Sequence, residues 1–269
     1  MRSSYTETLE PASEAEAIDA FGDGEGVTVL AGGTILMPEV TYGRYPRGGR
    51  TLMLHRAGLS GIRGDGPVTI GAMTPLAEVA ARGIEPLASA AAAVADAEIR
   101  NQATFGGNLC APPGRESPRG DLQTPLLVMK ATVRSAGAGG ERTEPVEDYL
   151  AADESRLVLS VEVSPPDGAA YVTQRRPHSH SYSVISVAAA TYDGVLRLAA
   201  GGVGSSAVRL RAVEAALADG QPAEKAAGRA AHETRPQDDA LASAWYRREI
   251  LPVLIARVLQ QVEEAQSWN

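Results

Sequence analysis

Two short glycine-rich segments constrain the fold of this chain more than any other feature. The first, Ala31-Gly32-Gly33-Thr34, follows the apolar run Val27–Leu30, and the second, Thr104-Phe105-Gly106-Gly107-Asn108, follows a long alanine-rich stretch. Glycine has no Cβ atom, so a ligand can approach the backbone closely at such turns. Successive N–H groups then converge on phosphate oxygens. The pair predicts a cradle for the diphosphate of a dinucleotide, although the first turn alone is equally compatible with a ligand-free connection.

Other ways of binding nucleotides do not match the sequence. No Gly-x-Gly-x-x-Gly segment opens a helix within a βαβ unit, so a nicotinamide-binding Rossmann domain is not predicted. Lys130 and Lys225 are the only lysines, and neither belongs to a phosphate-binding P-loop. The formal net charge of -8 argues against a nucleic-acid partner, because phosphate backbones require a concentrated positive field.

The single cysteine, Cys110, limits the redox chemistry that this chain can hold by itself. One thiol forms no internal disulfide and binds neither an iron–sulfur cluster nor a structural zinc, so we expect no metal site here. Packing is the expected role of Cys110. The segment Met1–Phe21 has no apolar signal core, and no run approaches the roughly 18 apolar residues of a membrane span. We therefore expect a cytoplasmic protein without membrane insertion.

Local patterns predict alternating strands and helices up to about residue 170. Ser13 and Glu16 have the spacing of a capping box and predict a helix through Phe21. Asp121 begins a helical pattern, where it would either cap the helix or accept a hydrogen bond from a ribose hydroxyl. The other expected strands are Val27–Leu30, Thr51–His55, Val68–Ile70, Ala131–Ser135 and Leu157–Val163, and the other expected helices are Pro75–Ala81, Pro86–Glu98 and Asp121–Met129.

The pattern changes near residue 170. Three strands are predicted at Ala170–Thr173, Ser183–Tyr192 and Val195–Gly201, followed by helices at Val208–Leu217 and Trp245–Gln266. We therefore expect a small three-stranded antiparallel sheet backed by helices as a separate C-terminal domain.

Four motifs in order resemble one family. They are Ala31-Gly32-Gly33-Thr34, Thr69-Ile70-Gly71-Ala72, the run from Ile99 to Asn108, and Ser117-Pro118-Arg119-Gly120-Asp121. Together they are similar to the FAD-binding medium subunit of the molybdenum hydroxylases, which include xanthine and carbon monoxide dehydrogenases. The resemblance implies an α+β, two-subdomain FAD-binding fold of the vanillyl-alcohol-oxidase or PCMH type over residues 1–170, with subdomains of about 1–55 and 56–170. Residues 171–269 would form a domain like the C-terminal domain of the carbon monoxide dehydrogenase flavoprotein.

The resemblance also implies roles for individual residues. One run would wrap the diphosphate and ribityl region of FAD, and it comprises Val29, Leu30, Ala31, Gly32, Gly33, Thr34, Ile35 and Leu36. A second clamp would consist of Thr104, Gly106, Gly107 and Asn108. Asp121 would bind the adenosine ribose, and Leu159 would touch the flavin ring. Ile99 and Val94 would line the adenine or ring pocket.

Some positions depart from the family pattern. Ile35 stands where many relatives have a polar residue. The first strand of the tail has no lysine, so Arg175 or Arg176 would supply positive charge near the flavin, unless the pair is simply solvated. His178 and His180 suit an exposed polar turn better than a metal or proton-shuttle site.

The resemblance implies an electron-transfer subunit with no catalytic acid or base of its own. Its FAD would take electrons from a 2Fe-2S small subunit, which receives them from a molybdopterin large subunit, and would pass them to NAD or another acceptor. Two alternatives stay open. One is an autonomous FAD oxidoreductase on the same fold, and the other is a structural subunit that has lost its flavin.

Overall fold

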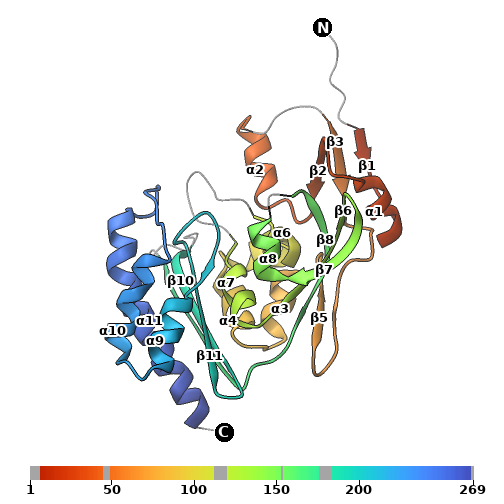
Figure 1. The fold of residues 1–269 in the computed structure, drawn as a ribbon. Coiled ribbons are helices and arrows are strands. Elements are labelled where there is room, and N and C mark those ends of the chain that lie inside the picture. Colours follow the sequence, from red (N-terminus) through yellow and green to blue (C-terminus); the bar gives the residue numbers. More distant parts are fainter. Residues whose placement is uncertain (1–6, 45–48, 112–119, 153, 176–182, 268–269) are drawn as a thin grey trace.

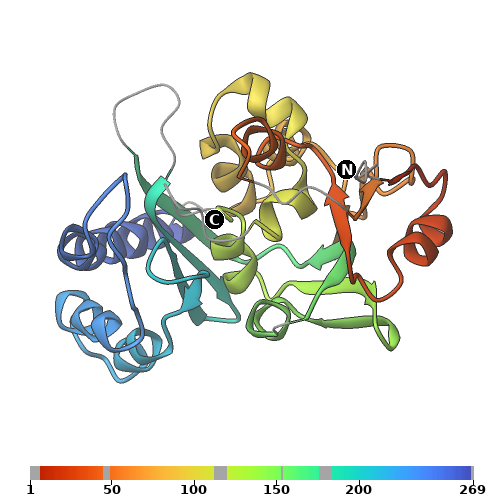
Figure 2. The same cartoon turned by 90° about the horizontal axis from the view of Figure 1, so that it is seen from above.

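The structure is a computed structural model that describes residues 7–44, 49–111, 120–152, 154–175 and 183–267. In these residues the strands form three sheets, with helices between and around them (Figure 1). Seen from above, the C-terminal strands and helices lie to one side of the remainder of the chain (Figure 2). The expected mixture of helices and sheets is confirmed.

The N-terminal part is a small parallel sheet with the strand order β1-β3-β2. Its elements are β1 (Glu7–Leu9), α1 (Glu14–Phe21), β2 (Val27–Leu30), α2 (Leu36–Thr41) and β3 (Arg50–Met53). The start of α1 follows the predicted capping box: the Glu16 N–H donates to Ser13 Oγ at 3.2 Å, and the Glu16 carboxylate accepts from the Ala12 N–H at 2.8 Å. These bonds occupy N–H groups that have no partner inside the helix.

The middle part is an antiparallel sheet in the order β4-β5-β8-β6-β7. The strands are β4 (Ile62–Arg63), β5 (Val68–Gly71), β6 (Thr132–Gly137), β7 (Gly140–Pro145) and β8 (Arg156–Val163). The helices are α3 (Leu76–Ala81), α4 (Leu87–Ala93), α5 (Ala97–Gln102), α6 (Phe105–Leu109), α7 (Gln123–Val128) and α8 (Val146–Ala151). Because their apolar faces are buried together, this helical group and the sheet share one aliphatic core.

The expected helix over Pro86–Glu98 is wrong, because the chain breaks it into α4 and α5. Ala95 has a φ of 41°, which lies in the left-handed region that a helix cannot use. The Asp96 carboxylate then caps α5 by accepting from the Ile99 N–H at 2.9 Å. Arg100 Nη1 donates to the carbonyls of Val94 and Ala95 at 2.9 and 3.0 Å, which satisfies the exposed end of the first helix.

The C-terminal sheet has four strands, not three, in the order β12-β11-β10-β9. The elements are β9 (Gly168–Arg175), β10 (Ser183–Tyr192), β11 (Val195–Gly201), β12 (Val208–Arg209), α9 (Arg211–Ala218), α10 (Ala223–Ala227), the 3-10 helix η1 (Gly228–His232) and α11 (Ala244–Ser267). The expected helix from Val208 therefore begins only at Arg211. The Glu214 carboxylate of α9 accepts from the Leu198 N–H at 2.7 Å and from Arg209 Nε at 2.8 Å, which ties the short β12 to β11.

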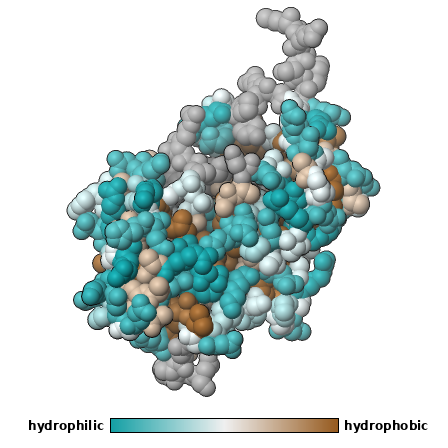
Figure 3. Space-filling view, in the orientation of Figure 1, coloured by the Kyte–Doolittle hydropathy of each residue, from teal (hydrophilic) through white to brown (hydrophobic). Residues whose placement is uncertain are grey.

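Strand β10 joins the middle part to the C-terminal part, because it is buried on both faces. Ala188 and Ala190 belong to the core of the middle part, whereas Val187 and Ala189 belong to the C-terminal core under α11. Side chains alternate across a strand, so one strand can fill two cores. On the face shown in Figure 3, hydrophobic residues form small patches separated by hydrophilic ones. In the described part of the chain, no helix is both long and apolar enough to cross a membrane.

Candidate cofactor site

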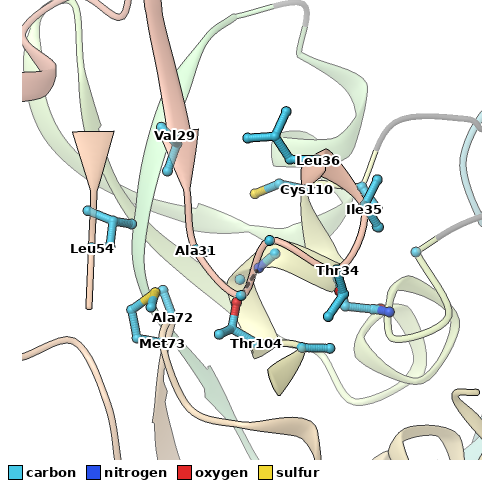
Figure 4. A pocket seen from close by; sticks show the side chains of 18 of the residues that line it. Val29, Ala31, Thr34, Ile35, Leu36, Leu54, Ala72, Met73, Thr104 and Cys110 are labelled. Atoms are coloured by element: carbon cyan, nitrogen blue, oxygen red, sulfur yellow. Dashed lines mark hydrogen bonds between the residues drawn. The ribbon is translucent and has the colours of Figure 1, made fainter. Parts of the chain in front are cut away.

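A cavity of about 600 Å³ opens between the N-terminal sheet and the helices of the middle part. Its size is in the range of pockets that hold small molecules and cofactors. Both glycine turns line it, and Figure 4 shows the segment from Ala31 to Leu36 passing in front of Thr104. The predicted residues that line it are Val29, Ala31, Gly32, Gly33, Thr34, Ile35, Leu36, Val94, Ile99, Thr104, Gly106, Gly107, Asn108 and Asp121.

The first turn leaves a row of backbone donors at the cavity. Beyond the end of β2, Gly33 adopts a φ of 71°, and its carbonyl accepts from the Met37 N–H at 2.8 Å to start α2. The N–H groups of residues 32–35 donate no hydrogen bond to any residue that the structure describes. Buried or half-buried N–H groups normally have a partner. A run of such donors along a cavity is therefore suited to bind an anion.

The absence of side chains allows the two turns to touch. A Cβ atom on Gly32 would collide with the carbonyl oxygen of Gln102 and lie 3.0 Å from Ala103 Cα. A Cβ on Gly106 would lie 2.9 Å from the Ala72 Cβ, and one on Gly107 would lie 2.8 Å from Thr104 Oγ1. Gly32 is thus needed for the first turn to close on the second, whereas Gly106 is needed for the second turn to pack on Ala72 and Gly107 for the turn itself to form.

The second turn is held by hydrogen bonds within the fold. The N–H groups of Phe105 and Gly106 donate to the carbonyls of Thr74 and Ala72, both at 2.8 Å. Thr104 Oγ1 caps α6 by accepting from the Gly107 N–H at 3.2 Å (Figure 4). The N–H groups of residues 105–107 are therefore already engaged, whereas the Thr104 hydroxyl hydrogen is available as a donor.

Asn108 and Asp121 form a polar corner of the cavity. The Asn108 side-chain oxygen accepts from the Leu122 N–H at 2.9 Å, so the amide is fixed in orientation. Asp121 does not cap α7, because Leu122 takes the N-cap position without a side-chain hydrogen bond. Burial raises the pKa of the Asp121 carboxyl, and the nearby Ser183 hydroxyl, Asn108 amide and Arg175 guanidinium oppose that rise.

Two predicted residues lie away from the cavity. Leu30 belongs to β2, and Leu159 is packed in the N-terminal core with 1% of its surface exposed. Neither is among the described residues that line the cavity, whereas Leu157 and Val158 are. The pairing of β8 with β6 skips Leu159, since Arg134 faces Ser160 and Ser135 faces Val158. The extra residue in β8 is a β-bulge at Leu159. Arg176, His178 and His180 lie outside the described residues.

Cys110 is not the packing residue that its sequence position predicts. It is exposed and lines the cavity (Figure 4). Its sulfur is 3.4 Å from the Tyr149 hydroxyl. Although the residue as a whole is exposed, its thiol lies against the protein at Tyr149, and desolvation there raises the pKa of the thiol and keeps it protonated at neutral pH.

Sequence reasoning also missed a buried arginine at the cavity. Arg156 donates through Nε to Ser135 Oγ at 2.9 Å and through Nη2 to the Gly140 carbonyl at 2.7 Å, so it binds the hairpin of β6 and β7. No local pattern marks such a residue, because its partners are distant in sequence. The other lining residues outside the prediction are Thr28, Glu39, Arg44, Leu54, Ala72, Met73, Ala95, Asp96, Ala103, Ala111, Gly120, Leu157 and Val158.

Two family models match this chain. The FAD binding domain in molybdopterin dehydrogenase matches residues 4–165, and the CO dehydrogenase flavoprotein C-terminal domain matches residues 170–262. The chain belongs to the molybdopterin dehydrogenase flavoprotein family. It is an FAD-binding medium subunit of a molybdenum hydroxylase-type dehydrogenase. The glycine contacts and unpaired N–H groups of the cavity fit the diphosphate of this cofactor.

Individual relatives agree with this family assignment. The uncharacterized protein YgfM of Escherichia coli K12 is 30% identical over 205 residues, which cover 75% of each chain. The 6-hydroxypseudooxynicotine dehydrogenase complex subunit alpha of Paenarthrobacter nicotinovorans is 27% identical over 261 residues, covering 88% of this chain and 86% of that protein. A chain of the carbon monoxide dehydrogenase from Hydrogenophaga pseudoflava superposes with a TM-score of 0.83 at 25% identity, covering 98% of this chain and 99% of that chain.

Proposed function

We propose that this flavoprotein relays electrons within a cytoplasmic complex. FAD in the cavity would accept electrons from a 2Fe-2S subunit, supplied by a molybdopterin subunit, and deliver them to NAD or another acceptor. The observation that carries the proposal is the row of unpaired N–H groups at residues 32–35 along a cavity closed by a second glycine turn. Relatives described as dehydrogenase complex subunits and medium chains support a multi-subunit setting.

The diphosphate would be held by the N–H groups of Gly32, Gly33, Thr34 and Ile35. Hydrogen bonds from N–H groups to an anion are charge-assisted, so they do not require a lysine. The Thr104 hydroxyl would donate from the opposite side, since its oxygen is already occupied by the Gly107 N–H. The apolar side chain of Ile35 would not weaken diphosphate binding, because this residue would contact the diphosphate through its backbone N–H.

The remaining lining would orient the sugar and the ring. The Asp121 carboxylate is placed to accept a hydrogen bond from a sugar hydroxyl. Leu157 and Val158, together with Leu54 and Met73, offer apolar contact of the kind that a planar ring system needs. When bound, FAD supplies the redox chemistry, and these residues bind it, orient it and exclude water.

Apart from Asp121, the charged groups of the lining are paired within the protein, which favours a relay over substrate chemistry. Asp96 caps α5, and Arg156 donates to Ser135 and to backbone carbonyls. Arg44 and Glu39 form an ion pair at 3.8 Å. A general acid or base must reach its substrate with a proton to exchange. Side chains that are already hydrogen-bonded or ion-paired within the protein serve binding and positioning instead.

We also propose the two-domain division at residues 1–170 and 171–269, with a PCMH-type first domain. Strand β8 ends at Val163 and β9 begins at Gly168, so the proposed boundary lies in the first residues of β9, just after the connection between two sheets. The two family models meet across the same stretch, because one ends at residue 165 and the other begins at residue 170.

Expression of the chain with its neighbouring reading frames tests the function. We expect a yellow complex that contains an iron–sulfur protein and a molybdopterin protein, in which substrate bleaches the flavin absorbance. The variant Gly107→Val should lose the flavin, because its side chain would meet Thr104 Oγ1. Turnover of a substrate by the isolated chain would contradict the relay. A chain that never binds flavin would instead support a structural subunit.

A further inference from the structure

A second, much smaller cavity adjoins the first at the junction with the C-terminal sheet. Its volume is about 30 Å³, and it is lined by Asp121, Ser183, Ser186 and the loop 202–207 among others. Gly120 and Asp121 line both cavities, so the Asp121 residue separates the cofactor cavity from the C-terminal domain. A polar space of this size is sufficient for one ordered water molecule.

Two buried hydroxyl groups of the C-terminal domain have no explained partner. Ser183 Oγ and the Tyr171 hydroxyl are inaccessible to solvent and have no hydrogen bond of full geometry to a residue that the structure describes, although the Ser183 hydroxyl is close enough to the Asp121 carboxyl to lower its pKa. Ser183 is only 8% exposed, and it lines the small cavity. The adjacent Ser186 and Thr124 hydroxyls, by contrast, bond to each other at 3.1 Å. Buried polar groups are nearly always hydrogen-bonded, directly or through water.

Both hydroxyls belong to the surroundings of Asp121. Tyr171 lies in β9. Burial and the charge of Asp121 raise the pKa of its phenol against the effect of the nearby Ser186, Thr173 and Ser183 hydroxyls, so the phenol stays protonated. Arg175, four residues further along β9, also acts on that carboxylate, as does the Asn108 amide from α6. Strands β9 and β10 thus place the hydroxyl groups of Tyr171 and Ser183 close to the Asp121 carboxylate.

We propose that Ser183 and Tyr171, together with one ordered water in the small cavity, hold the Asp121 carboxylate in position for the cofactor. The C-terminal domain thereby takes part in FAD binding without touching FAD through these residues. Ser183 and Tyr171 are positioning residues, and the inference rests on the proposed role of Asp121 toward a sugar hydroxyl of FAD.

The test measures the FAD dissociation constant of the full chain by fluorescence titration after flavin removal. Ser183→Ala and Tyr171→Phe should each weaken binding about fivefold to tenfold, the effect of one net hydrogen bond. In an Asp121→Asn background the same changes should weaken binding no further, because the carboxylate that they position is absent. Tyr192→Phe is the matched control: its hydroxyl bonds to the Ser164 carbonyl at 2.7 Å instead, so FAD affinity should not change.

Thermal unfolding of each variant separates affinity from folding. Ser183→Ala removes a single oxygen and keeps the test available if Tyr171→Phe folds poorly. Wild-type affinity in Ser183→Ala, or an equal loss in the wild-type and Asp121→Asn backgrounds, overturns the inference. If the wild type and Asp121→Asn bind FAD equally well, the role of Asp121 is refuted, but the cofactor site is not. If the wild type has no affinity for FAD, the cofactor site itself is refuted.

Discussion

Replacing Gly32 with alanine should separate the two turns that enclose the cofactor cavity. The added methyl group would collide with the Gln102 carbonyl oxygen and lie 3.0 Å from Ala103 Cα. Ordinary contacts of a Cβ atom lie between 3.4 and 4 Å. Both neighbours are backbone atoms, which cannot rotate away as a flexible side chain can. The two turns must therefore move apart, by about 1 Å for a contact this close.

Such a shift has two separate costs. Overpacking of a rigid site lowers the free energy of unfolding by about 1–3 kcal/mol. Displacement of the N–H groups of residues 32–35 relative to Thr104 would also remove at least one charge-assisted hydrogen bond, about 1.5–3 kcal/mol. The second cost corresponds to roughly 10- to 100-fold weaker FAD binding.

The assay is FAD titration of the flavin-free protein, followed by flavin fluorescence, with urea unfolding of the same samples. Gly66→Ala is the matched control, because a Cβ atom there meets nothing within 4 Å and the backbone φ is compatible with alanine. We expect Gly66→Ala to bind FAD like the wild type. If Gly32→Ala also retains wild-type affinity, the close approach of the two turns does not form the cofactor site.

Three further changes test other parts of the site. Thr104→Ala should lower the free energy of unfolding by about 1 kcal/mol through loss of the α6 cap, and it should weaken FAD binding. Thr104→Ser keeps the hydroxyl, so an equal loss of FAD affinity in both variants would contradict the role of that group. Asp121→Asn should raise the melting temperature of the flavin-free protein at neutral pH. Since burial raises the native pKa of this carboxyl above its unfolded value, the wild type loses stability as pH rises from the unfolded pKa to the native pKa. Below the unfolded pKa the stability advantage of the variant should vanish. Melting curves over pH check this, and a pH-independent difference would refute it. Asp96→Ala should destabilise the chain by about 1 kcal/mol in urea unfolding by removing the cap on the Ile99 N–H, and an unchanged midpoint would show that the break before α5 does not depend on this cap.

Local sequence patterns predict much of the fold. The capping box at Ser13 places α1, and runs of apolar residues place β2, β8, β10 and β11 to within a residue or two. The order of the motifs around Gly33 and Gly107 identifies the family, because each motif is a short stretch of contiguous chain. These features depend on neighbours in sequence, and so the sequence alone determines them.

The tertiary structure decides which side chains reach the site. Leu159 has the same local pattern as its neighbours, yet the pairing with β6 skips it and it lies in the core, whereas Leu157 and Val158 line the cavity. The short strand β12 exists only because β11 is there to pair with it. The contact between Gly32 and Gln102 joins residues seventy positions apart. Such features depend on pairing and packing between distant segments, and no local periodicity in the sequence indicates which segments come together.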